Sequence, residues 1–87
     1  MRGTTASGFE FTVNKESLDD WEMVDLLSQM AIDGNTLALP KFAKTFLGAE
    51  QCKALVEHCK TDGKAPVEKV MNEVLEIIQL LGDDGKN

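Results

Sequence analysis

The chain has 87 residues, of which 43% are hydrophobic and 28% are charged, and its formal net charge is −6. This length suits one domain, and the composition is ordinary for a soluble globular protein. Because an acidic surface repels the phosphates of nucleic acids and the headgroups of anionic membranes, we expect neither as a partner.

The first residues are predicted to form a flexible tail followed by one short strand. Met1–Gly8 is small and polar, so it buries too little apolar surface to offset the entropy cost of ordering. In residues 9–13, Phe9, Phe11 and Val13 alternate with polar residues, which predicts a strand. The sequence contains no second run of this type. The strand is therefore expected either to lie against the helices as an extended arm or to pair with another chain.

Apolar residues at spacings of three and four predict four helices in the remainder of the chain. The expected spans are about 16–32, 40–47, 49–60 and 66–81. The predicted fold class is mainly α, a compact bundle of about four short helices with an N-terminal extended arm. We place one helical domain at 9–81, between flexible tails at 1–8 and 82–87.

The first predicted helix has a second apolar stripe beside its main one. The main stripe consists of Leu18, Trp21, Val24, Leu27 and Ala31, and the second of Met23, Leu26 and Met30. The second stripe, together with Leu75 and Leu80 of the last helix, is a surplus beyond what one partner helix needs. Either another helix covers these side chains, or some of them are exposed and bind a partner helix.

Charge is sorted along the chain. Residues 16–33 contain six acids and no base, whereas residues 41–64 contain five lysines and three acids. Such sorting either forms weak ion pairs between the helices or permits head-to-tail contacts between copies. Because exposed ion pairs contribute at most about 1 kcal/mol, the pattern bears more on partner choice than on stability.

Cys52, His58 and Cys59 are the strongest candidates for chemistry, but their pattern favours core packing. Their spacing matches no zinc motif, and both cysteines share a helix face with Leu55 and Val56. On a helix, seven residues separate the two Cα atoms by about 10 Å, which is too far for a disulfide. No calcium loop, phosphate loop or nucleophile–base motif occurs. We expect no cofactor, no metal and no enzymatic activity.

Two cysteines without a secretion signal indicate a reducing compartment. No apolar run reaches the roughly 18–20 residues of a membrane span. These observations predict a cytoplasmic protein.

Three stretches of the sequence resemble a known family. They are residues 18–22 (LDDWE) with Leu26, residues 33–40 (DGNTLALP), and residues 47–51 (LGAEQ) leading to Leu55 and His58. Over about residues 9–81 the chain resembles the small acidic tail assembly chaperones of long-tailed phages and prophages. The motifs that carry the resemblance are helix and turn signals.

The resemblance implies a non-enzymatic protein that keeps the long tape-measure protein soluble and helps assemble the tail tube, in the cytoplasm of the host cell. It supplies no catalytic residues. Members of the family are often made in two lengths by a ribosomal frameshift, and Gly85-Lys86-Asn87 is compatible with a slippery codon sequence.

The sequence thus leaves three hypotheses. The first is the assembly chaperone, whose partner is a tape-measure or tail-tube protein. The second is a structural or regulatory interaction module that homo-oligomerises through its N-terminal strand, and the third is a metal- or thiol-dependent enzyme. The partner-binding residues predicted for the first two are Phe9, Phe11, Val13, Met23, Leu26, Met30, Leu75 and Leu80.

Overall fold

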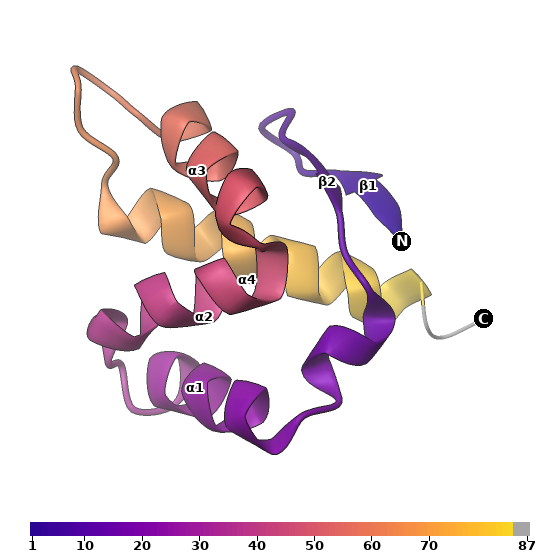
Figure 1. The fold of residues 1–87 in the computed structure, drawn as a ribbon. Helices are drawn as coiled ribbons and strands as arrows, with labels where there is room; N and C mark the ends of the chain where they lie inside the picture. The colour runs from indigo at the N-terminus through magenta and orange to yellow at the C-terminus, as the bar shows by residue number, and fades with distance from the viewer. Residues whose placement is uncertain (85–87) are drawn as a thin grey trace.

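The computed structural model describes residues 1–84 and has the mainly helical fold that the sequence predicts (Figure 1). The α-helices of this part are α1 (Trp21–Ala31), α2 (Leu39–Leu47), α3 (Ala49–His58) and α4 (Val67–Asp84). A two-stranded antiparallel sheet, β1 (Arg2–Thr4) and β2 (Glu10–Thr12), precedes them. Two 3-10 helices, η1 (Lys15–Leu18) and η2 (Thr36–Ala38), lead into α1 and α2.

Local sequence signals set most of the element ends. The Asn14 side chain accepts a hydrogen bond from the backbone N–H of Glu16 at 2.9 Å and so caps η1. Gly34 adopts a positive φ of 71° just after α1, the conformation in which a glycine commonly ends a helix. Asp62 and Gly63 both have positive φ in the turn before α4, which is the conformation that Asp-Gly favours.

Two predicted boundaries need correction. The first predicted helix is interrupted after Leu18, where η1 ends, and α1 begins only at Trp21. At the other end, α4 continues through Gly82 to Asp84 instead of ending near Leu81. The rest of the predicted C-terminal tail, residues 85–87 with the possible slippery sequence, lies outside the described residues.

The core lies between α2, α3 and α4. In Figure 1, α4 crosses behind α2 and α3, while α1 lies along the opposite side of α2. Phe42, Leu55, Val74 and Ile77, which come from these three central helices, have no exposed surface. Each of these helices has an apolar stripe at helical spacing. The three stripes bury their side chains against one another in one shared core.

The N-terminal strand pairs within its own chain, which corrects the prediction of a flexible tail. β1 and β2 form an antiparallel hairpin in which Gly3 faces Phe11. A Cβ atom on Gly3 would lie 2.7 Å from Cζ of Phe11, so the aromatic ring fits only over a glycine. The sequence predicts an oligomer through the strand at residues 9–13 because it shows no partner for that strand. In the structure, β1 of the same chain is the partner.

The outer edge of β2 is occupied by a side chain of α3. The carboxamide of Gln51 accepts a hydrogen bond from the Thr12 N–H at 2.6 Å and donates one to the Thr12 carbonyl at 2.9 Å. It also donates to the carbonyl of Leu47. One amide side chain thus makes the two bonds that a neighbouring strand would make, and it joins the hairpin to the α2–α3 corner.

None of the helices within residues 1–84 combines the length and apolar character that crossing a bilayer requires.

Candidate functional site

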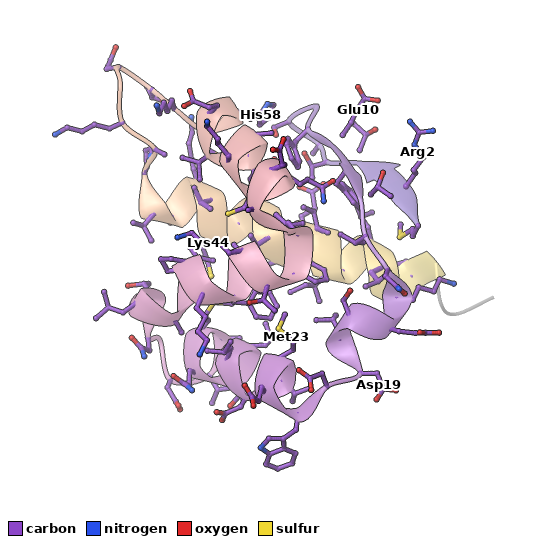
Figure 2. The ribbon with its side chains drawn as sticks, viewed as in Figure 1. Arg2, Glu10, Asp19, Met23, Lys44 and His58 are labelled. Atoms are coloured by element: carbon purple, nitrogen blue, oxygen red, sulfur yellow. The ribbon has the colours of Figure 1, made fainter. Side chains whose placement is uncertain are left out.

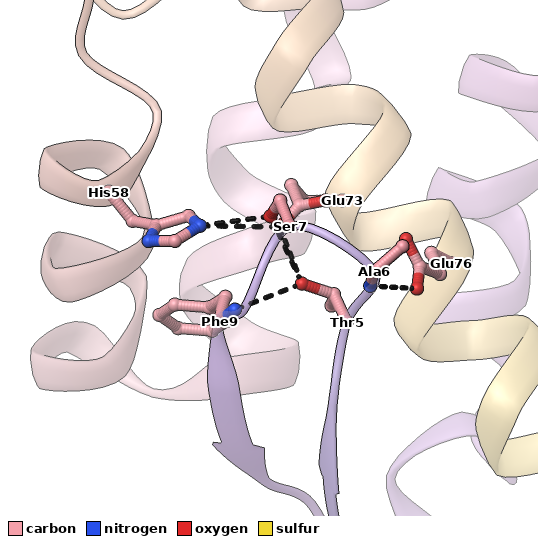
Figure 3. Close-up of polar contacts among 7 residues, drawn as sticks. All are labelled: Thr5, Ala6, Ser7, Phe9, His58, Glu73 and Glu76. Carbon is pink, nitrogen blue, oxygen red and sulfur yellow. Dashed lines mark hydrogen bonds and ion pairs between the residues drawn. The ribbon is translucent and has the colours of Figure 1, made fainter.

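The turn of the hairpin is held against α3 and α4 by a polar cluster (Figure 3). Glu73 of α4 is only 8% exposed. Its Oε1 accepts hydrogen bonds from the hydroxyls of Thr5 at 2.8 Å and Ser7 at 2.7 Å. The Ser7 oxygen is also 2.9 Å from Nε2 of His58 on α3. We call Thr5, Ser7, His58 and Glu73 the hairpin clasp.

The geometry of the clasp suits anchoring better than nucleophilic catalysis. A serine nucleophile donates its proton to a histidine, and an acid orients the other ring nitrogen of that histidine. Here the Ser7 proton is directed to Glu73, so His58 Nε2 acts as the donor to Ser7. Glu73 moreover lies 3.9 Å from the same Nε2 atom that contacts Ser7. Ser7 therefore donates its proton to the Glu73 carboxylate and not to a histidine base.

An open cavity of about 230 Å³ adjoins the clasp. It is lined by Ser7, His58, Cys59, Lys69, Asn72 and Glu73. The Cys59 thiol is buried, and its pKa is raised by this burial and by the nearby Glu73 carboxylate, against the opposing effect of Lys69. A thiol with a raised pKa is a poor nucleophile near neutral pH.

Both cysteines pack in the core as free thiols, as their position on an apolar helix face predicts. Burial also raises the pKa of Cys52, partly opposed by the charge of Lys44. Within residues 1–84, no cluster of three or more His, Cys, Asp or Glu side chains is arranged to hold a metal ion.

Five of the eight predicted partner-binding residues are buried and are therefore not exposed to a partner. The structure buries Phe9, Phe11, Val13, Met23 and Met30. The first three are sealed because the hairpin folds onto the helices, and the two methionines because α1 turns that face toward the core. The other three, which are only partly buried, are Leu26, Leu75 and Leu80.

Exposed apolar surface exists, but on other residues. Trp21 is 85% exposed, Ile32 80% and Leu37 88%, and Val24 and Val67 are each about half exposed. Trp21 and Val24 of α1, with Ile32 at its C-cap, lie at helical spacing on the side of the helix opposite Met23 and Met30. We call these three residues the outer stripe of α1.

A second exposed apolar region is a groove of about 290 Å³ between η2, α2, α3 and the start of α4. Lys44, labelled on α2 in Figure 2, is the charged residue that lines it. The apolar groove is lined by Thr36, Leu37, Leu39, Pro40, Ala43, Lys44, Cys52, Val56, Ala65, Val67 and Val70.

The sequence contained a partial signal for these surfaces. The spacing showed that α1 has two apolar stripes, but the wrong one was assigned to the core. Leu37 lies beside a turn, where helical spacing gives no direction, whereas Val67 falls on the apolar stripe of α4, which predicts burial although the side chain is exposed. A large apolar residue close to a turn, such as Leu37 two positions after Asn35, was the sign that the sequence offered.

Comparisons with protein-family models, with curated proteins and with solved structures found no match.

Proposed function

We propose that this protein is a non-enzymatic assembly chaperone that binds apolar helical segments of a structural protein, with the tape-measure protein of a phage tail as its partner. The observation that carries the proposal is the apolar groove. Twelve of the 18 buried core residues come from η2, α2, α3 and α4, the elements that form the groove, and the groove is the part of this apolar packing that stays open to solvent.

The shape and chemistry of the groove fit an amphipathic helix. Such helices insert apolar side chains at spacings of three, four and seven into an apolar channel. Leu37 and Val67 stand exposed at the groove, where they would contact the flanks of an inserted helix. The chain itself provides no donor set for metal chemistry within residues 1–84, and its clasp is arranged for anchoring. Binding is therefore the role that the side chains support best.

The resemblance to tail assembly chaperones narrows the class of partner. A tape-measure protein is long and helical, and its apolar faces need cover before the tail assembles around it. A small acidic protein with an open apolar groove supplies that cover and adds net negative charge, which favours solubility.

Co-expression with a tape-measure protein tests the proposal. We expect the wild-type chain to raise the soluble fraction of the partner and to co-purify with it. The variant Leu37→Glu/Val67→Glu places two charges at the groove and should abolish both effects while the fold melts normally, because both side chains are exposed.

Gln79→Glu is the matched control, since Gln79 is exposed on α4 and does not line the groove. It should behave as the wild type. Equal capture by the groove variant and the control would overturn the groove as the binding surface. The absence of a tape-measure gene beside the gene for this chain would count against the phage-tail role itself.

A further inference from the structure

The outer stripe of α1 is a second exposed apolar surface. The charges that accompany it are opposite in sign to those of the apolar groove. Its apolar residues are accompanied by Asp20, Glu22 and Asp25, and α1 contains no lysine or arginine. An exposed tryptophan at one end of such a stripe is the type of side chain that anchors protein interfaces.

The apolar groove has complementary charge. Lys44 lines it, and lysines outnumber acids among the sequence neighbours of its lining residues, with Lys41, Lys53, Lys64 and Lys69 against Glu57 and Glu68. None of the lining residues is acidic. Lys44 is also close enough to Cys52 in the groove to lower the pKa of that thiol against the larger effect of burial. The groove therefore favours an apolar helix with acidic flanks.

The outer stripe is turned away from the interior of its own chain. Trp21, Val24 and Ile32 lie on the side of α1 opposite Met23 and Met30, which are buried in the core. A parallel pairing of α1 with α1 of another copy is disfavoured, because it would bring Asp20, Glu22 and Asp25 against like charges.

We propose that the apolar groove binds the outer stripe of α1 from a second copy of this chain, so that copies associate head to tail. The helix supplies the acidic flanks and the tryptophan anchor, and the groove supplies the apolar channel and Lys44. Because the two surfaces differ, the contact is heterologous and each added copy presents a new groove or a new stripe.

This inference shares the groove with the proposed function but does not depend on what the other partner is. A partner helix and a neighbouring α1 compete for one channel. Self-association would therefore occupy the groove when the partner is scarce, and binding of the partner would release single copies.

Sedimentation across a concentration series tests the inference. For the wild type we expect the average mass to rise with concentration without stopping at a dimer, and to fall when salt is added, because salt screens the acidic–basic contact. Trp21→Ser should weaken the association by at least about 30-fold, since it removes the anchor. Leu37→Glu/Val67→Glu should be monomeric, and Gln79→Glu should match the wild type.

Mixing the two defective variants gives the sharpest result. Trp21→Ser retains a groove and Leu37→Glu/Val67→Glu retains an outer stripe, so an equimolar mixture should form a one-to-one heterodimer and nothing larger. A wild type that stays monomeric, a mass that stops at a symmetric dimer, or a mixture that stays monomeric would each overturn the inference.

The same variants separate this inference from the proposed function. Trp21→Ser leaves the groove intact, so it should still capture the tape-measure protein while failing to self-associate. A wild type that captures the partner but never self-associates overturns the head-to-tail contact alone. A chain that self-associates as described but captures no tape-measure protein overturns the proposed function alone.

Discussion

The N-terminal hairpin and helix α1 both carry large apolar side chains, yet the molecule treats them in opposite ways. Every large apolar side chain of the hairpin is sealed inside, and polar contacts from two helices hold its turn and its edge. α1 instead buries one stripe and leaves Trp21 open to solvent. The difference shows that burial depends on the partner elements that a segment finds, and less on how apolar the segment is.

The largest expected effect contrasts one aromatic residue from each region. Phe11→Ala removes a buried ring and should lower the free energy of unfolding by about 3–5 kcal/mol. Trp21→Ser should change it by less than about 0.5 kcal/mol, because the side chain is exposed. Urea denaturation of both variants measures the contrast. Similar losses in the two variants would mean that the hairpin and α1 are equally part of the core.

The hairpin clasp provides the next test. Glu73→Ala leaves the hydroxyls of Thr5 and Ser7 without their acceptor and should cost about 1–3 kcal/mol. Glu73→Gln retains one acceptor oxygen and should lose less. The control Glu57→Ala removes only an exposed ion pair with Lys60 and should cost about 0.5 kcal/mol or less. Thermal melts of the three variants measure these losses of stability. A Glu73→Ala variant that melts like the wild type would show that the hairpin clasp does not stabilise the fold.

The link between Gln51 and β2 is expected to contribute less. Gln51→Ala loses two hydrogen bonds to Thr12 at a partly solvated edge, which should cost about 1 kcal/mol. Hydrogen exchange at the Thr12 amide should accelerate in the same variant, because this amide donates to Gln51. Unchanged exchange at Thr12 with a normal melt would show that the Gln51 carboxamide does not protect this edge of β2.

The smallest expected effect concerns the two thiols. Burial raises the pKa of Cys52 and Cys59 in the folded chain. Their contribution to stability is therefore fully present below the ordinary thiol pKa of about 8.5 and is lost as the pH rises through the folded values. We expect the wild type to lose more stability above that pH than Cys52→Ala/Cys59→Ala does. Denaturation at a series of alkaline pH values measures this, and parallel curves would contradict it.

The helical part of the fold could be predicted because its signals are local. The stripe of α4, the break at Gly34 and the Asp62-Gly63 turn each follow from neighbouring residues. β1 could not be predicted, because Arg2-Gly3-Thr4 has no apolar alternation and pairs only once Phe11 packs over Gly3. The two stripes of α1 were visible, but periodicity alone does not say which of them faces the core.

The site was harder to predict than the fold for the same reason. The clasp joins Ser7 to Glu73 across 66 positions of the chain, and the groove combines side chains from η2, α2, α3 and α4. Such arrangements depend on packing between distant elements. Composition and spacing pointed to a surplus of apolar surface, whereas its position required the packed structure.

The Gln51 carboxamide has a consequence for how the chain behaves among its own unfolded copies. A short sheet with an open margin is a template on which stray extended segments can add and grow into cross-β aggregates. At Thr12 that template is already filled by a side chain that cannot itself be extended by a further strand. Gln51 therefore blocks the addition of a further strand at this edge of β2, and so it opposes fibril growth there.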